Sequence, residues 1–268
     1  MPESHHKLAK VIEYMKSHWP SQVKSEWQVD IHDYAKILPQ ILADFTAHAS
    51  KNHKLFRVAG LSGSGKTTQI LPAIEAYCGK NNLEPILVAA RRFVDYHPYK
   101  NEIENFYGAE NLRKNTDEFS TIMMFLTLSE LIKKGYDIIL DVTLLDPKME
   151  TILLKFLTAA NYQMLILMIA ISPTVTEYFL KNRAWRHSKK TEEEFIRATA
   201  EALKFYAKAA SKTRIILWSV YDLDPVYDGE IQNSLPTFQE YSTCKKLPKP
   251  DDEARKQAKI NYLTTQHS

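Results

Sequence analysis

Short, almost continuous apolar runs alternate along the chain with longer stretches in which apolar residues recur every three or four positions. The runs that indicate strands lie at residues 55–60, 84–90, 136–142, 163–172 and 214–220. The stretches that indicate helices lie at residues 66–77, 116–134, 147–161, 174–184 and 191–211. Strands that are apolar throughout are typical of a parallel sheet covered by helices on both faces. The alternation therefore predicts a doubly wound α/β fold with a mainly parallel sheet of about five strands.

The two ends of the chain have a different pattern. Residues 1–50 form a helical N-terminal flank, most amphipathic in the stretch HDYAKILPQILADFTAHA. Residues 234–268 contain prolines and mixed charges, which predict an extended segment followed by a short helix, partly disordered. The central α/β domain is expected at residues 51–233.

A phosphate-binding loop is predicted at the end of the first strand, in the stretch VAGLSGSGKTTQ. Gly60, Gly65, Lys66 and Thr67 satisfy the pattern G-x-x-x-x-G-K-[ST], with a strand before it and a helix after it. Glycines let backbone N–H groups surround a phosphate, a lysine bridges the β- and γ-phosphates, and a threonine hydroxyl coordinates Mg²⁺. We therefore expect a three-layer fold of the P-loop NTPase type that binds ATP and Mg²⁺. The residues expected at the nucleotide are Gly60, Ser62, Gly63, Ser64, Gly65, Lys66, Thr67 and Thr68.

Two further features favour phosphate transfer to a small molecule. No N-K-x-D motif follows the loop, which argues against a switch GTPase. Arg183 and Arg186, in the stretch KNRAWRHSKK, are candidates for a basic lid that stabilises the transferring phosphoryl group. Asp141 ends a predicted strand on the side where such sheets bind ligands. It is a candidate for holding Mg²⁺ through water or for accepting the acceptor's proton.

Composition limits the partners and the compartment. The net charge of +3 is too small to predict nucleic-acid binding by itself, and Cys78 and Cys244 lack the spacing of a metal site. The N-terminus has no signal-peptide pattern, and the longest apolar run, residues 164–171, is too short to span a bilayer. We expect a soluble cytoplasmic protein without a membrane partner. The acidic stretch VYDLDPVYDGE, with Asp222, Asp224 and Asp228, is expected to be a surface loop rather than a calcium site.

From about residue 31 to residue 228 the chain resembles the zeta toxin family of phosphate-loop kinases. The resemblance is carried by GLSGSGKT in the loop, by FVDYHP at residues 93–98, and by GYDIILDVTL at residues 135–144. The arginine pair of the lid and the late V-Y-D at residues 226–228 agree with it. The resemblance implies transfer of the γ-phosphate of ATP to a hydroxyl of UDP-N-acetylglucosamine or a related nucleotide-linked metabolite. It also implies an antitoxin partner that blocks the ATP site, and places His97 and Thr143 at the acceptor side.

The chain departs from the family at the catalytic base. The family has an aspartate two residues before the phenylalanine of F-x-x-x-H-P, and this position is Arg91, which cannot act as a base. The family's glutamate is replaced by Asp141, and its next residue, a glycine, by Val142.

Three explanations of Arg91 are open. The first is that Asp95 or Asp141 has taken over as the base. The second is that Arg91 and Arg92 bind an anionic group of a different acceptor. The third is that the chain binds nucleotide without turnover. If residues 93–98 are extended, Asp95 and His97 share one side of the segment. The alternatives to a small-molecule kinase are a silent nucleotide-binding protein and a nucleoside or polynucleotide kinase.

Overall fold

The structure is a computed structural model of the chain. It describes residues 12–17, 21–60, 64–142, 147–170, 213–219, 223–225, 227–230 and 252–266. The helices predicted at 174–184 and 191–211 lie outside the described residues. The chain forms two compact units, which we describe separately. The helical unit comprises Met1–His48 and Val88–Lys133, and the sheet unit comprises Ala49–Leu87 and Lys134–Ser268.

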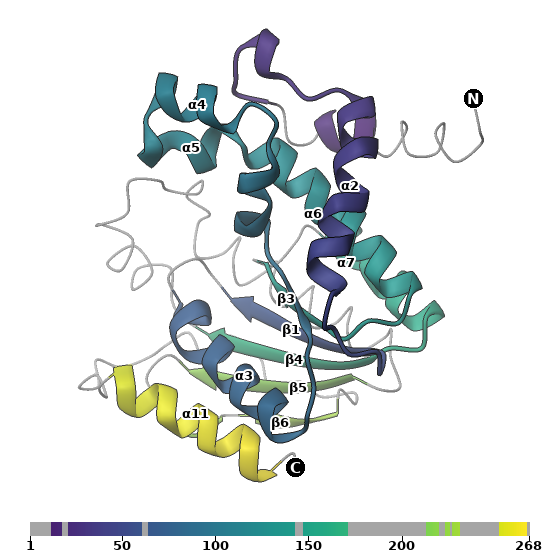
Figure 1. The fold of residues 1–268 in the computed structure, drawn as a ribbon. Helices are drawn as coiled ribbons and strands as arrows, with labels where there is room; N and C mark the ends of the chain where they lie inside the picture. Colours follow the sequence, from purple (N-terminus) through teal and green to yellow (C-terminus); the bar gives the residue numbers. More distant parts are fainter. Residues whose placement is uncertain are drawn as a thin grey trace. The chain divides into compact units, whose positions relative to one another are not determined.

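The sheet has six described strands in the order β2-β3-β1-β4-β5-β6 (Figure 1). Their bounds are Ile86–Val88 for β2, Ile138–Asp141 for β3, Lys54–Gly60 for β1, Gln163–Ala170 for β4, Thr213–Ser219 for β5 and Tyr227–Glu230 for β6. The ladders β1–β3, β1–β4 and β4–β5 are parallel, and β5–β6 is antiparallel. The predicted doubly wound, mainly parallel α/β fold is thus confirmed.

The strand β6 corrects one expectation. Residues 227–230 were expected in a surface loop, but they pair with β5 and extend the sheet beyond the five strands predicted. The short stretch YDGE has no apolar run, so periodicity did not indicate a strand there. Asp228 is not a free surface carboxylate, because it accepts hydrogen bonds from Arg214 Nε at 2.6 Å and from Tyr262 Oη at 2.7 Å.

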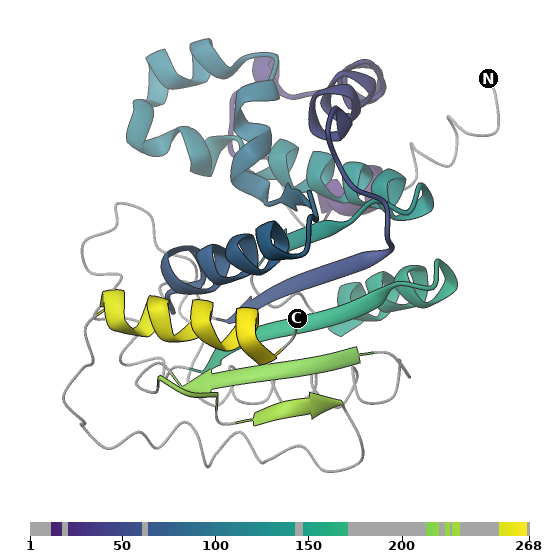
Figure 2. The same ribbon diagram turned by 60° about the horizontal axis from the view of Figure 1, so that its bottom comes forward.

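Helices cover both faces of the sheet. In β4, Ile166 and Met168 are as deeply buried as Leu167 and Ile169, although successive side chains of a strand point to opposite faces. Figure 2 shows α3 (Leu71–Lys80) and α11 (Asp252–Gln266) on the near side of the sheet, with α7 (Pro147–Ala159) behind it. This layering explains why the strands are apolar throughout rather than alternating.

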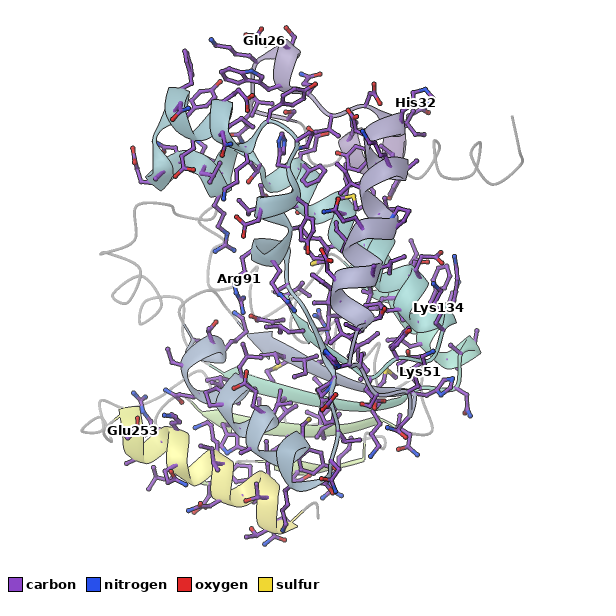
Figure 3. All side chains as sticks on the ribbon, viewed as in Figure 1. Glu26, His32, Lys51, Arg91, Lys134 and Glu253 are labelled. Atoms are coloured by element: carbon purple, nitrogen blue, oxygen red, sulfur yellow. The ribbon has the colours of Figure 1, made fainter. Side chains whose placement is uncertain are left out.

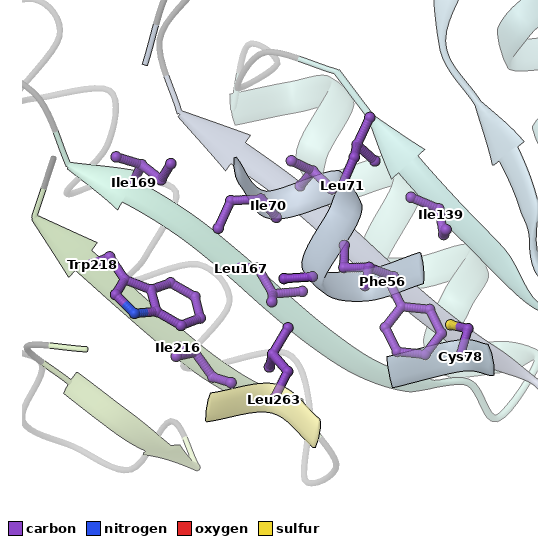
Figure 4. Packing of buried hydrophobic residues seen from close by; sticks show 13 residues of the cluster. Phe56, Ile70, Leu71, Cys78, Ile139, Leu167, Ile169, Ile216, Trp218 and Leu263 are labelled. Carbon is purple, nitrogen blue, oxygen red and sulfur yellow. The ribbon is translucent and has the colours of Figure 1, made fainter. Parts of the chain in front are cut away.

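One hydrophobic core lies between the sheet and the pair α3–α11 (Figure 4). Side chains of β1, β4 and β5 meet those of both helices, and the cluster includes Phe56, Ile74, Leu167, Trp218 and Leu263. The helix α11 comes late in the chain, so this cluster joins residues far apart in the sequence, such as Ile74 and Leu263. An exposed hydrogen bond from Lys80 Nζ to the carbonyl oxygen of Thr264 also links the two helices.

One buried carboxylate links β1 and β3 at their amino ends. Asp137 precedes β3, and its oxygens accept hydrogen bonds from Ser50 Oγ, from the backbone N–H and side-chain amide of Asn52, and from the N–H of Lys54, at 2.6 to 2.9 Å. Charged oxygens that receive several donors are strongly stabilised when buried. Asp137 therefore fixes the entry of β1 beside that of β3.

The helical unit is built around α6 (Asp117–Lys133), most of whose side chains are buried. It packs against α2 (Ile31–Thr46) and the 3₁₀ helix η3 (Ala90–Tyr96). The unit also contains the short elements η1 (Ser25–Trp27), α4 (Lys100–Tyr107) and α5 (Ala109–Asn115). None of the helices in the described part of the chain has the length and apolar character needed to cross a membrane.

Candidate functional site

The phosphate loop leaves the carboxyl end of β1 at Gly60, where the backbone allows only glycine. The φ angle of Gly60 is 134°, and a Cβ there would lie 3.0 Å from the carbonyl oxygen of Ile169 and 2.9 Å from Ser64 Oγ. At the other end of the loop, Gly65 has a φ of 95°, and a Cβ would lie 3.0 Å from Gln69 Nε2. Gly60 is therefore required by its conformation and by the nearby backbone of Ile169, and Gly65 by its conformation.

A helix begins directly after the loop. Lys66–Ile70 forms a single π-helical turn, η2, which continues into α3. The N–H of Gln69 donates to the carbonyl oxygen of Gly65 at 2.9 Å, and the N–H of Leu71 donates to the carbonyl oxygen of Lys66 and closes the π-helical turn. Pro72 falls in the first turn of α3, where it contributes no N–H donor to the helix that continues from η2. The helix N-terminus thus meets the loop, as phosphate binding requires.

The predicted nucleotide residues differ in exposure. Lys66 Nζ donates a hydrogen bond to the carbonyl oxygen of Gly60 at 2.9 Å, so the two ends of the loop are linked. Ser64 is buried, whereas Thr67 and Thr68 are exposed, as hydroxyls that contact a ligand must be. Ser62 and Gly63 lie outside the described residues.

Asp141 lies at the same edge of the sheet as the loop. It is the last residue of β3, the strand next to β1, and pairs in register with Val58, two residues before Gly60. Adjacent strands lie about 4.8 Å apart, and two residues span about 6.6 Å, so the carboxylate belongs to the surroundings of the loop. Its residue is 7% exposed. The described residues contain no group of three or more His, Cys, Asp and Glu that could hold a metal by themselves, so any Mg²⁺ there would need phosphate and water ligands as well.

Arg57 is a residue near this edge that we did not single out from the sequence. It lies in the middle of β1, is 1% exposed, and its Nη1 donates to the carbonyl oxygen of Val142 at 3.4 Å. Val142 directly follows Asp141, so Arg57 supports the backbone at the end of β3. The signal was present in the sequence, because a charged residue interrupts the apolar run LFRVAG.

Four predicted residues lie in the helical unit, on η3 or directly after it. Arg91 is half-buried, and Arg92 is exposed with its guanidinium 4.3 Å from the ring centroid of Phe45. Asp95 is exposed and bonded to Lys100 Nζ at 2.6 Å, a contact that raises the pKa of Lys100. Residues 90–96 form a 3₁₀ helix, so the condition of an extended segment, under which Asp95 and His97 would share one side, is not met.

His97 is buried rather than open to solvent. Its Nδ1 accepts a hydrogen bond from the N–H of Tyr99 at 3.2 Å, and its ring lies edge-on to Phe119 at 4.8 Å between centroids. Burial lowers the pKa of His97 to about 4. The imidazole is therefore neutral at pH 7 with its proton on Nε2, which suits a residue that shapes the turn.

The remaining predicted site residues, Thr143, Arg183 and Arg186, lie outside the described residues. Within the sheet unit, the structure brings together the loop and Asp141. Arg91, Arg92, Asp95 and His97 are grouped separately in the helical unit (Figure 3 labels Arg91).

Comparison with known proteins identifies the family and the fold of the chain. The sequence profile of one family, described as Zeta toxin, matches residues 40–229. Among solved structures, the chain is similar to one from the PezAT chromosomal toxin–antitoxin system of Streptococcus pneumoniae, with a TM-score of 0.63 and 17% identity over 90% of this chain and 99% of that one. A candidate kinase from Chloroflexus aurantiacus has a TM-score of 0.37 and 16% identity over 62% of this chain and 87% of that one, a score too low to establish a shared fold. None of the curated proteins compared with the chain matches it.

Proposed function

Because the chain belongs to the zeta toxin family, we propose that it is a phosphate-loop kinase that transfers the γ-phosphate of ATP to a hydroxyl of a nucleotide-sugar or related metabolite. The observation that carries the proposal is the pairing of Val58 with Asp141, which aligns a carboxylate with the strand that leads into the loop. Phosphoryl transfer depends mainly on positioning and on neutralising charge, and this edge of the sheet offers both.

The donor side rests on the loop. Backbone N–H groups between Gly60 and the first turn of η2 would bind the β-phosphate, and the two glycines leave the space that a Cβ would fill. Lys66 would exchange its bond to the Gly60 carbonyl oxygen for the β- and γ-phosphates. Lys66 thus carries a positive charge to the group that is transferred.

Magnesium fits the residues present at this edge. The exposed hydroxyl of Thr67 would bind the ion directly, and Asp141 would hold it through water. Bound Mg²⁺ supplies positive charge beside the phosphates. Arg183 and Arg186 of the proposed lid would add further positive charge over the transferred group.

On the acceptor side, we favour Asp141 over Asp95 as the base. Asp141 is in the same unit as the loop and is almost buried, whereas Asp95 is exposed and bonded to Lys100. In the transfer, the acceptor oxygen forms a bond to the γ-phosphorus while the bond to the β–γ bridging oxygen breaks. The acceptor's proton passes to the carboxylate. Arg91, Arg92 and Thr143 would bind the anionic and hydroxyl groups of the acceptor. His97 would shape the turn that follows η3.

A second candidate function is nucleotide binding without turnover. The observation that favours it is Arg91 at the position of the family's base, half-buried on η3. In that case the loop would still bind ATP, and no acceptor would be phosphorylated. We further propose a cytoplasmic location and an antitoxin partner that covers the ATP site, since a structural relative comes from a toxin–antitoxin system.

The test is an ATP turnover assay with a panel of acceptors: UDP-N-acetylglucosamine, other nucleotide-sugars, nucleosides and 5′-hydroxyl oligonucleotides. The wild type is compared with Lys66→Ala, Asp141→Asn, Asp95→Asn and Lys133→Ala, a surface control paired with Glu130. We expect Lys66→Ala and Asp141→Asn to lose at least about a hundredfold in kcat, and the control to match the wild type.

The outcomes separate the alternatives. ATP binding without phosphorylation of any acceptor and without hydrolysis favours the silent protein. Transfer to nucleosides or oligonucleotides alone favours a nucleoside or polynucleotide kinase. Full activity of Asp141→Asn together with loss in Asp95→Asn makes Asp95 the base.

A further inference from the structure

The ring of Phe45 contacts three side chains of η3. Phe45 lies in the last turn of α2, and its ring centroid is 5.4 Å from that of Phe93 and 6.3 Å from that of Tyr96. The guanidinium carbon of Arg92 lies 4.3 Å from the same centroid. These distances are typical of attractive aromatic and cation–π contacts. Both elements belong to the helical unit, so one side chain of α2 supports η3 at more than one turn within a single compact unit.

The spacing of these contacts determines how η3 is rotated about its own axis. In a 3₁₀ helix, side chains three residues apart lie one above the other. Phe93 and Tyr96 therefore form one ridge of η3. Arg92 belongs to a second ridge, and Phe45 contacts both ridges. Arg91 lies on the third ridge, so the ring that sets the rotation of η3 also sets the direction in which Arg91 leaves it.

A hydrogen bond beside Phe45 joins the same two elements. Tyr96 Oη donates to Asp44 Oδ2 at 2.8 Å. Burial and this bond raise the pKa of Tyr96 to about 12, so the hydroxyl keeps its proton at neutral pH and remains a donor. The last residue of η3 is thus attached to α2 by a hydrogen bond as well as by ring packing.

The helices that support η3 are themselves anchored in the helical unit. Asp30 caps the start of α2 by accepting two backbone hydrogen bonds, at 2.7 and 3.1 Å, and Tyr34 and Ile41 of α2 are fully buried. On α6, the ring of Phe119 packs against His97, the residue that directly follows η3. A 3₁₀ helix of seven residues needs such support, because its hydrogen bonds are less favourable than those of an α-helix.

We propose that Phe45, Asp44 and Tyr96 are positioning residues that fix η3 on α2 for the binding of an anionic acceptor. Through η3 they orient Arg91 and Arg92, the two arginines that the proposed function assigns to the acceptor. The proposal rests on that function and adds residues that act through η3 rather than by contact with the substrate. A guanidinium group that is oriented before binding loses less conformational freedom when it meets a phosphate or carboxylate, so the acceptor binds more tightly.

The experiment measures steady-state kinetics of the full-length protein with ATP and UDP-N-acetylglucosamine, or with another anionic acceptor if the acceptor panel selects one. Phe45→Leu removes the ring and keeps an apolar side chain, Tyr96→Phe removes only the hydroxyl, and Phe45→Tyr keeps the ring. The matched controls are Phe106→Leu and Tyr107→Phe, which make the same two changes on α4, where both rings contact Trp27. Urea unfolding is recorded for each variant.

We expect Phe45→Leu and Tyr96→Phe to raise the KM for the acceptor about three- to tenfold and to change the KM for ATP less than about twofold. Phe45→Tyr and the two controls on α4 should match the wild type. A purely structural role predicts another result, because a smaller folded fraction lowers the apparent kcat and leaves both KM values unchanged.

The proposal is overturned if the acceptor KM of the two variants equals that of the controls, or if only kcat falls. If Phe45→Leu does not fold, Tyr96→Phe decides. A wild type that acts only on uncharged nucleosides also overturns the proposal, because the arginines would then have no anion to bind. A wild type that phosphorylates no acceptor refutes the proposed function and the proposal with it, whereas a normal acceptor KM in active variants refutes the proposal alone.

Discussion

Lys66 Nζ donates a hydrogen bond to the carbonyl oxygen of Gly60 at 2.9 Å, so the residue that ends the phosphate loop is joined to the residue that begins it. The bond holds the ammonium at the mouth of the loop, where a phosphate would compete with the carbonyl oxygen for it. Substitution of Lys66 can separate two roles. Closing the loop affects the free energy of unfolding, whereas binding phosphate affects the affinity for ATP.

The first prediction concerns this pair. Lys66→Met should keep the protein folded, with a change in the free energy of unfolding of at most about 1 kcal/mol, because the bond is one partly exposed hydrogen bond. Its affinity for ATP should fall at least about thirtyfold, since it loses a charge-assisted contact with the phosphates. Urea unfolding and calorimetry measure the two quantities. An unchanged ATP affinity would mean that the lysine only closes the loop.

The second prediction compares two glycines of the sheet unit. Gly60→Ala should cost at least about 2 kcal/mol of stability, because its Cβ would clash with the backbone of Ile169 at a positive φ. Gly79→Ala in α3 is the control, since a Cβ there meets nothing within 4 Å. This change should stabilise the protein by about 0.5–1 kcal/mol through helix propensity. Equal effects of the two changes in urea unfolding would contradict the loop geometry.

The third prediction concerns Asp137. Its carboxylate receives bonds from Ser50, Asn52 and Lys54, and an amide can accept only on one oxygen. Asp137→Asn should therefore lower the free energy of unfolding by about 2–4 kcal/mol. The exposed Asp224→Asn should change it by less than about 0.5 kcal/mol. Chemical denaturation of both variants provides the measurement.

The fourth prediction is a pH dependence caused by His97. Its pKa is about 4 in the folded protein and 6.5 when unperturbed, so between these values the unfolded chain binds a proton that the folded protein does not. Stability should therefore decrease as the pH falls from about 6.5 to about 4, by up to about 3 kcal/mol. Above this window the group contributes no pH dependence.

The variant His97→Gln isolates this contribution. Its stability should vary less between pH 7 and pH 4.5 than that of the wild type, when both are followed by urea unfolding. His32→Gln removes an exposed histidine and should leave the wild-type slope. If His97→Gln and the wild type show the same slope, the ring is not kept neutral by burial.

Local sequence determined the parts of this protein whose conformation depends on near neighbours. The apolar runs of β1, β4 and β5 indicated strands because burial on both faces leaves few positions for polar residues. Gly60 and Gly65 marked the loop because only glycine adopts its backbone angles without strain. The family resemblance and the mainly parallel fold followed from these short motifs.

Only the tertiary structure decided which distant residues share a neighbourhood. The antiparallel strand β6 has no apolar run, and it exists because β5 offers an edge and Asp228 bonds to Arg214 and Tyr262. The burial of Lys259 contradicts what its side chain favours in water, and it follows from the sheet and helices that close over it. Such contacts join residues far apart in the chain, and no local pattern encodes them, because their free energy arises only when the whole sheet and its covering helices are packed together.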